Sequence, residues 1–185
     1  MTLGQAFDSV LTAALAGGEW AWAELYDDLS PLVLGYLRGR GSVDPDDLTG
    51  EVFLQVVRDI RSFQGGERDF RAWVLSIAHH RLLDDIRYRK RRPADAVPDD
   101  LLQEMATKGD VEAEAMSSIA AERVVRIIRM LTSDQQDVLL LRMVADLSIE
   151  EVARIIEKPP GAVKTLQHRA LAQLRKKISR EGVSL

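Results

Sequence analysis

The chain contains no cysteine among its 185 residues. This absence excludes disulfides, thiolate metal sites and a cysteine redox switch, and it fits a reducing compartment such as the cytoplasm. No apolar run reaches the ~18 residues that a membrane span needs, so we expect no membrane insertion. The first residues, 1–10, lack a basic start followed by an apolar stretch, and we therefore predict no signal peptide.

Aromatic residues and strand patterns are also scarce. Aromatics make up 5% of the chain, and no segment sustains an alternation of apolar and polar residues. Helical spacing is frequent by contrast, since Val52, Phe53, Val56, Val57 and Ile60 recur on one face of a helix. We therefore predict an all-α fold of two small helical domains.

The predicted helices follow from apolar spacing and from residues that begin or end a helix. Asp44 can cap a helix whose first residue is Pro45, because proline suits the first helical position. Ser148 and Glu151 form the capping-box pattern at the start of another helix. The predicted helices cover residues 19–38, a stretch that starts at 45, and residues 70–91, 111–130, 133–145, 148–157 and 161–179.

An acidic segment separates the two predicted domains. Residues 94–114 carry seven acidic residues against Lys108 alone, and Pro93, Pro98 and Gly109 lie in or beside this stretch. Proline, glycine and charge of one sign are typical of a linker. We predict a first domain of residues 1–92, an acidic linker of residues 93–112 and a second domain of residues 113–185.

Positive charge gathers on either side of this linker, although the net charge of the chain is −4. Residues 87–92 carry five positive residues in six, and residues 158–180 carry seven with no acidic residue. Charge separated in this way produces local fields that favour binding of nucleic acid. A solvated basic helix face gives the same pattern, so charge alone leaves that alternative open.

The C-terminal region has the pattern of a helix-turn-helix. Pro159 ends the helix that Ser148 begins, and a second helix starts near Pro160 or Gly161. The second helix begins with polar and basic residues, which a recognition helix uses to contact base edges in the major groove. An ordinary helical hairpin with a basic outer face gives a similar pattern. The candidate DNA-contacting residues are Lys158, Gly161, Lys164, Thr165, Gln167, His168 and Arg169.

Three parts of the chain resemble motifs of the sigma-70 family of bacterial RNA polymerase subunits. Residues 46–54 (DDLTGEVFL) resemble its core-polymerase-binding helix, and residues 63–78 resemble the promoter-melting segment that follows that helix. Residues 147–153, 160–164 and 168–171 resemble the motif that reads the minus-35 element. The order and the short chain are similar to the extracytoplasmic-function (ECF) group, which retains only the second and fourth sigma domains.

This resemblance implies that the acidic helix docks on the clamp helices of the largest polymerase subunit, and that the chain also meets the polymerase flap. Carboxylates on that helix suit a basic partner, and apolar side chains suit the centre of an interface. Leu48, Phe53 and Val56 can instead fill the protein core, and this is the reading that we favour for Phe53 and Val56. The implied core-polymerase-binding residues are Asp47, Leu48, Glu51, Phe53, Gln55 and Val56.

The resemblance also implies promoter melting. A protein without ATP opens duplex DNA only by binding the unpaired state more tightly. The loop of residues 63–69 would hold a base flipped out of the minus-10 element, where stacking on an aromatic ring returns roughly 1–3 kcal/mol per base. His80 stands where many relatives carry Asn, which leaves the base preference open. Leu166 stands where some relatives carry Arg, so one minus-35 contact of the family can be absent here. The implied minus-10 residues are Phe63, Gln64, Arg68, His79, His80, Arg81, Arg87, Arg89 and Lys90.

The implied function is that of an alternative sigma factor, with core RNA polymerase, promoter DNA and an anti-sigma factor as partners. We expect no enzyme activity, cofactor or metal, because the chain lacks a strand-linked phosphate loop and its three histidines come without cysteine. A stand-alone dimeric helix-turn-helix repressor is a second hypothesis, which gives the acidic helix at residues 46–51 no role. A sigma-like decoy that binds polymerase or an antagonist without reading DNA is a third.

Overall fold

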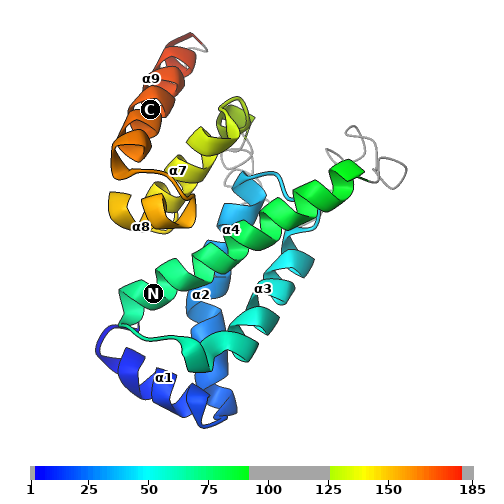
Figure 1. Cartoon of the computed structure of the whole chain (residues 1–185), viewed down its shortest axis with the longest axis vertical. Coiled ribbons are helices and arrows are strands. Elements are labelled where there is room, and N and C mark those ends of the chain that lie inside the picture. Colours follow the sequence, from blue (N-terminus) through cyan, green and yellow to red (C-terminus); the bar gives the residue numbers. More distant parts are fainter. Residues whose placement is uncertain (1–2, 92–125, 181–185) are drawn as a thin grey trace, which may run out of the picture.

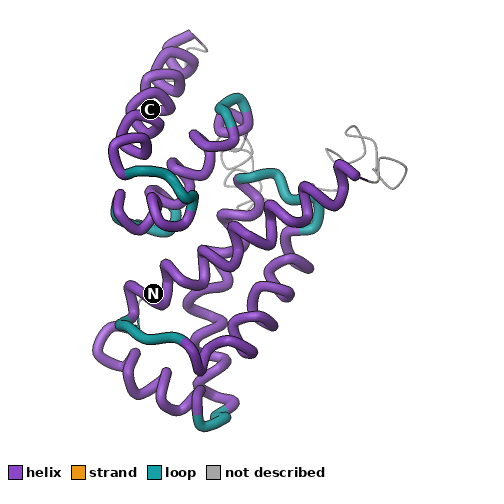
Figure 2. Tube along the Cα trace, in the orientation of Figure 1, coloured by secondary structure: helices purple, strands orange, loops and turns teal. Residues whose placement is uncertain are grey.

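The computed structural model describes residues 3–91 and 126–180, and both ranges are helices joined by short connections (Figure 1, Figure 2). The predicted all-α fold is confirmed for these ranges, in which no strand occurs. None of their helices combines the length and the apolar character that crossing a membrane requires. The elements are a 3-10 helix Gly4–Ala6, α1 Phe7–Leu15, α2 Glu19–Gly39, α3 Pro45–Asp59, a 3-10 helix Ile60–Ser62, α4 Glu67–Arg91, α7 Ser133–Met143, α8 Ile149–Ile155 and α9 Pro160–Arg180.

The capping residues that the sequence predicts for α3 and α8 are confirmed. The Asp44 carboxylate accepts a hydrogen bond from the Asp47 amide at 3.0 Å, and α3 begins at Pro45. Ser148 and Glu151 form both hydrogen bonds of the capping box at the start of α8. The linker of residues 93–112 and the predicted helix of residues 111–130 lie outside the described residues, except for residues 126–130, of which 126–129 are helical.

The largest differences from the predicted helices are the presence of α1 and the start of α4. Helix α1 was not predicted, although Phe7, Val10 and Ala14 recur at helical spacing and are its buried residues. Helix α4 begins three residues earlier than predicted, at Glu67. Gly65, whose φ of +143° suits glycine alone, turns the chain there, and the Gly66 amide donates to the Asp69 carboxylate at 3.2 Å. The turn at Gly65 and the hydrogen bond between Gly66 and Asp69 therefore begin α4 before its apolar pattern starts.

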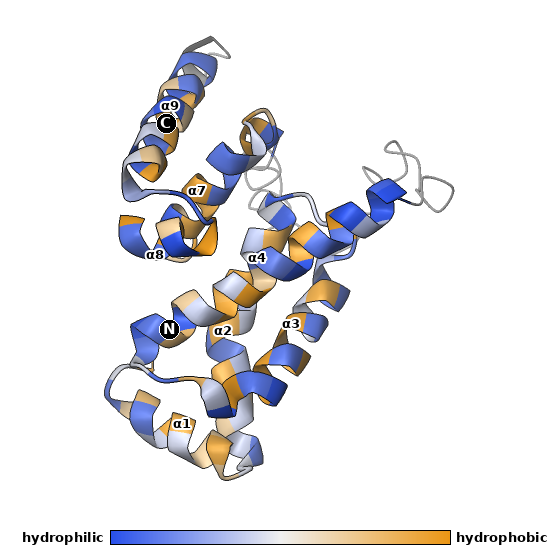
Figure 3. Ribbon diagram, viewed as in Figure 1, coloured by the Kyte–Doolittle hydropathy of each residue, from blue (hydrophilic) through white to orange (hydrophobic). Residues whose placement is uncertain are grey.

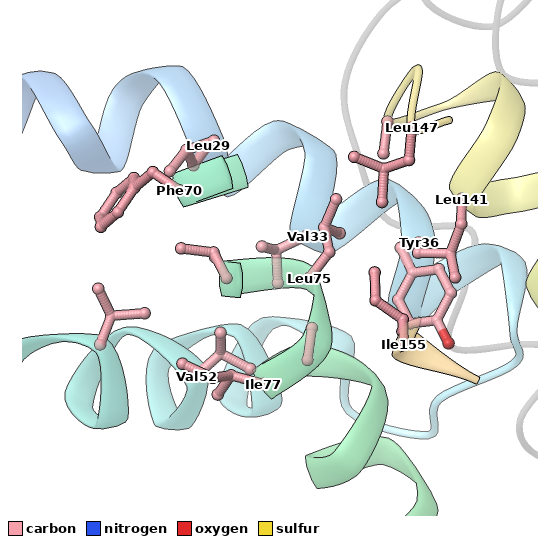
Figure 4. Packing of buried hydrophobic residues seen from close by; sticks show 14 of the residues in the cluster. Leu29, Val33, Tyr36, Val52, Phe70, Leu75, Ile77, Leu141, Leu147 and Ile155 are labelled. Atoms are coloured by element: carbon pink, nitrogen blue, oxygen red, sulfur yellow. The ribbon is translucent and has the colours of Figure 1, made fainter. Parts of the chain in front are cut away.

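Helices α1 to α4 form the N-terminal half, residues 3–91. Helix α1 packs along α2, and α2, α3 and α4 pack on one another around Leu25, Val33, Val52, Phe70 and Leu75, which are all at most 1% exposed. Figure 4 shows Val33, Val52, Phe70 and Leu75 within this core. Burying each such side chain contributes about 1.5–3 kcal/mol, so this half is held by apolar burial.

Helices α7, α8 and α9 form the C-terminal half, residues 126–180. Helix α9 crosses α7 and buries Val163 and Ala170 completely. The turn before α9 contains Glu157 at a φ of +53°, and the Lys158 amide donates to the Ala153 carbonyl at 3.0 Å, which closes α8. This is the predicted pair of helices with a short turn between them.

The two halves contact one another (Figure 1). Helix α2 meets α7, and α4 meets α8, so one buried cluster runs through both halves. In Figure 4, Leu141, Leu147 and Ile155 of the C-terminal half lie around Tyr36 of the N-terminal half. This contact decides which of the candidate residues remain accessible.

Candidate nucleic-acid and partner interfaces

Helix α3 divides its candidate residues between the core and the surface. Leu48, Phe53 and Val56 are 7%, 8% and 1% exposed, so they fill the core and are not available to a partner in this arrangement. Asp47 and Glu51 are exposed. Gln55 is half-buried and accepts a hydrogen bond from Arg81 Nε at 2.7 Å, while Arg81 Nη1 lies 3.8 Å from Glu51 Oε2. Arg81 therefore ties α4 to α3.

The exposed apolar side chains of α3 are not among the residues predicted to bind core polymerase. Leu54 is 59% exposed and Val57 is 50% exposed, three positions apart on the outer face of the helix. The sequence carried a signal for Leu54, because a leucine that lies off the stripe of Val52, Phe53 and Val56 faces away from the core. An exposed apolar pair between carboxylates is typical of a protein–protein contact.

The loop before α4 is built around an aromatic cluster. The Phe63 ring lies 5.0 Å from the Phe70 ring and 5.4 Å from the Trp73 ring. Phe63 and Trp73 are half-buried, whereas Gln64 and Arg68 are exposed. Phe63, Gln64 and Trp73 line an open cavity of about 450 Å³ whose opposite wall is α8. Trp73 therefore packs with the core and still borders the cavity.

Residue Arg68 of this loop region contacts the C-terminal half. Its Nε donates to Glu151 Oε1 at 3.0 Å. Burial by itself raises the pKa of the Glu151 carboxyl, but hydrogen bonds from Ser148 and the nearby Arg68 together bring that pKa below its ordinary value. The capping residue of α8 is thus also the partner of a predicted minus-10 residue.

His79 lies in a buried polar cluster between the halves, hereafter the interdomain cluster of Tyr36, Arg40, His79 and Asp137. Asp137 Oδ1 accepts hydrogen bonds from the Tyr36 hydroxyl at 2.7 Å and from Arg40 Nε at 2.5 Å. His79 Nδ1 lies 2.8 Å from the Tyr36 hydroxyl oxygen, and its N–H donates there because the tyrosine proton is given to Asp137. His79 is only 5% exposed, so it does not face a DNA strand in this arrangement.

Within the interdomain cluster, the positive charge of Arg40 is balanced by the negative charge of Asp137. Burial raises the pKa of Asp137, but hydrogen bonding from His79 and the charge of Arg40 outweigh that effect and lower it. Burial and the Asp137 carboxylate both raise the pKa of Tyr36 well above its ordinary value. Asp137 is therefore ionised and Tyr36 neutral at neutral pH, as a buried Arg–Asp pair requires.

The C-terminal part of α4 carries the remaining minus-10 candidates. Arg87 pairs with Asp84 at 3.1 Å and Arg89 with Asp85 at 2.9 Å, within the same helix. His80 is exposed, with Nε2 3.9 Å from Glu157 Oε1 of the C-terminal half. Figure 3 colours the end of α4 near residue 91 hydrophilic. Arg87 and Lys90 also line a second cavity, of about 310 Å³, together with the minus-35 candidate Lys158.

The start of α9 presents the other predicted DNA-contacting residues. Val163 and Ala170 are fully buried against α7 and Leu166 is partly buried, which turns the opposite face outward. Gln167 is half-buried, and Lys158 pairs with Asp134 at 3.1 Å. The structure thus brings five candidates together on one outward surface, which are Gly161, Lys164, Thr165, His168 and Arg169.

Comparison with known proteins places both halves of the chain in the sigma-70 family. Residues 25–92 match sigma-70 region 2, and residues 121–174 match sigma-70 region 4. The ECF RNA polymerase sigma factor BldN of Streptomyces coelicolor is 33% identical over 163 residues, which cover 87% of this chain and 61% of BldN. The ECF RNA polymerase sigma factor SigD of Mycobacterium bovis is 30% identical over 188 residues, which cover 97% of this chain and 87% of SigD.

A solved structure has the same arrangement of helices. CnrH, determined in complex with the cytosolic domain of CnrY, matches with a TM-score of 0.69 over 95% of this chain and 99% of CnrH. The sequences are 20% identical, so this likeness concerns the fold. It extends over both halves of the chain.

Proposed function

This chain belongs to the ECF sigma factors of the sigma-70 family, and we propose that it binds core RNA polymerase and directs transcription initiation at a specific set of promoters. The observation that carries the proposal is the pairing, in one chain, of an acidic helix with exposed apolar residues and a helix-turn-helix with an outward basic face. The family to which the chain belongs consists of transcription initiation factors and is not a class of enzymes.

The proposed polymerase surface is the outer face of α3. Asp47 and Glu51 supply carboxylates for a basic partner, and Leu54 and Val57 supply the apolar centre. Leu48, Phe53 and Val56 support this face from the core. The clamp helices of the largest polymerase subunit are the partner we assign to it, and the flap is assigned to the C-terminal half.

The proposed DNA surfaces divide the promoter between the halves. Lys164, Thr165, His168 and Arg169 on α9 read the minus-35 element in the major groove. The loop of residues 63–69 and its cavity accept an unpaired base of the minus-10 element, and Arg87 and Lys90 hold backbone phosphates. This division follows the predicted domains of residues 1–92 and 113–185 and the linker of 93–112 between them.

We further propose an anti-sigma protein as a regulator and the cytoplasm, where polymerase works, as the location. CnrH was solved with the cytosolic domain of CnrY, and a protein that covers both halves of this chain would act on the same pair of surfaces. Such a partner would compete with polymerase for α3 and with DNA for the loop of residues 63–69.

Reconstitution tests the proposal directly. Core polymerase with this chain should start transcripts at defined sites, and mapping transcript starts after overexpression should reveal one shared pair of upstream elements. A chain that does not bind core polymerase would end the proposal. Specific binding of a palindromic site by a dimer of the free chain would favour the repressor hypothesis instead.

A further inference from the structure

The second cavity, between α4, the start of α7 and the turn before α9, has a lining that changes along α4. Leu83 and Ile86 are half-buried in this lining, and Ile156 at the end of α8 adds a third aliphatic side chain. The proposed function uses none of these three residues. The volume of about 310 Å³ falls within the ~300–1,000 Å³ of small-molecule sites, whose walls are mostly apolar with a few polar groups. The cavity therefore suits the apolar part of one small molecule.

Three cations line the cavity beside these aliphatic residues. Arg87 and Lys90 follow on the next turn of α4, and Lys158 reaches the same cavity from the turn before α9. Arg87 and Lys158 each pair at 3.1 Å with an exposed carboxylate, that of Asp84 and that of Asp134. Exposed ion pairs contribute little net stability, so an anion with several charges can take the place of these carboxylates.

The carboxylates that line the cavity leave it with a net positive charge. Asp137 is neutralised by Arg40, whose Nε lies 2.5 Å from Asp137 Oδ1. Asp134 then stands alone against the three cations. Ser133 also lines the cavity and is the first residue of α7, and the N-terminal end of a helix favours an anion. The positive charge, the hydroxyl group and the helix end together favour a phosphorylated ligand.

We propose that this cavity binds a nucleoside di- or triphosphate. The base lies against Leu83, Ile86 and Ile156, where burial of its ring is favourable, and the phosphates lie on the three cations. Inorganic phosphate would leave the aliphatic side chains in water, and an uncharged ligand would leave the cations unmatched. Because α4 belongs to the N-terminal half and α7 to the C-terminal half, neither half alone holds the complete site.

A bound nucleotide occupies cations that the proposed function assigns to the promoter. Arg87 and Lys90 hold backbone phosphates in that function, so the nucleotide and the DNA compete for the end of α4. Only this competition rests on the proposed function, because binding of the nucleotide requires neither polymerase nor DNA. The nucleotide concentration would then set how much of the chain is available to a promoter.

Calorimetric titration of the full chain with ATP, without divalent cations, tests the site. We expect saturable binding of one ATP per chain. Lys90→Gln with Lys158→Gln should weaken it by roughly 2- to 30-fold, because two partly exposed charge pairs are lost. Arg58→Gln with Arg61→Gln is the matched control, since both arginines are exposed outside this cavity and the net charge changes equally. The control pair should leave the affinity unchanged at ordinary salt concentrations.

A truncation in the aliphatic part tests whether the ligand carries a base. Ile86→Ala should weaken ATP binding by roughly fourfold or more, equivalent to one CH₂ group no longer buried, and should leave the binding of inorganic pyrophosphate unchanged. The milder Ile86→Val should lie between Ile86→Ala and the parent chain. Helix content measured by circular dichroism confirms that each variant is folded. Pyrophosphate and adenosine should each bind more weakly than ATP.

Three results would overturn the site. The first is the absence of saturable binding at millimolar ATP. The second is an equal loss of affinity in the Arg58→Gln, Arg61→Gln control, which would make the binding a matter of net charge. The third is equal affinity for pyrophosphate and ATP with no effect of Ile86→Ala, which would exclude a nucleotide as the ligand.

Competition is measured separately, with a fluorescent single-stranded oligonucleotide and the full chain. ATP should weaken binding of the oligonucleotide more than sodium chloride of equal ionic strength does. This difference should be lost in the chain that carries Lys90→Gln with Lys158→Gln. Equal effects of ATP and sodium chloride on the parent chain would overturn the competition and leave the nucleotide site intact. None of these assays contains polymerase, so their failure and the failure of the sigma-factor function are distinguishable.

Discussion

The start of α9 and the loop before α4 are both proposed DNA surfaces, but the fold treats them differently. On α9, Lys164 and Arg169 stand outward over a buried stripe that includes Val163 and Ala170. At the loop, Arg68 is paired with Glu151, and α8 lies across the cavity. The proposed minus-35 surface is therefore exposed, whereas the proposed minus-10 loop lies against α8.

The largest effect should come from removing the exposed α9 cations. Each base or phosphate contact of this kind contributes roughly 1–3 kcal/mol, so Lys164→Ala with Arg169→Ala should weaken promoter binding by roughly 30-fold or more. Lys176→Ala, on the exposed C-terminal part of α9, should change it little. Holoenzyme binding to promoter fragments at one fixed salt concentration measures the difference. Unchanged specific binding in the double variant would contradict the minus-35 assignment.

Truncating the exposed apolar pair on α3 should act on polymerase instead of DNA. Leu54→Ala with Val57→Ala removes side chains that are 59% and 50% exposed, so the fold should persist. Interface residues that matter cost more than about 1 kcal/mol when truncated, which predicts roughly tenfold weaker binding to core polymerase. Leu15→Ala, at a leucine 40% exposed on α1, is the control. Equal affinities of the double variant and the control would show that α3 docks by other residues.

The covered loop should be sensitive at one glycine and tolerant at its neighbour. Gly65→Ala forces an L residue to a φ of +143° and places its Cβ 2.7 Å from Asp69 Cβ, whereas a Cβ at Gly66 meets nothing within 4 Å. Backbone strain of this kind costs about 1–3 kcal/mol. We expect slower promoter opening and a lower melting temperature for Gly65→Ala, with Gly66→Ala near the parent in both. Equal opening rates would mean that the loop shape is not needed.

Much of this fold could be predicted from the sequence, because caps and helical periodicity are local. The start of α3 at Pro45 and the capping box at Ser148 both follow from neighbouring residues. The burial of His79 could not be predicted, since its cluster joins Tyr36 to Asp137 across 101 positions. Nor could the pattern of α3 separate the residues that fill the core, such as Phe53, from those a partner can reach.

The smallest effect should be on the pH dependence of the contact. The pKa of Asp137 and that of Glu151 are both lowered in this arrangement, from ordinary values of 3.8 and 4.5. Their stabilising contribution is thus fully present above those ordinary values and is lost as the pH falls through the lowered ones. Asp137 faces Tyr36, Arg40 and His79, and Glu151 faces Arg68.

We therefore expect the population in which the halves are in contact to stay constant above about pH 5 and to fall as the pH decreases below about 4. Energy transfer between dyes attached at Arg61→Cys and Ala172→Cys, which are both exposed positions, reports that population, with helix content checked by circular dichroism. Adding Asp137→Asn should flatten the response. An equally steep response in the chain that carries Asp137→Asn would assign the dependence to other groups.

The most direct test of the contact between the halves is the distance that separates them in the free chain and in the promoter complex. Arg61→Cys and Ala172→Cys, both exposed, allow two dyes to be attached to a chain without other cysteines. We predict efficient energy transfer in the free chain and a marked loss of transfer in the complex with core polymerase and promoter, as the halves separate toward the ~85 Å between the two promoter elements. The same transfer efficiency in the free chain and in the promoter complex would contradict the account.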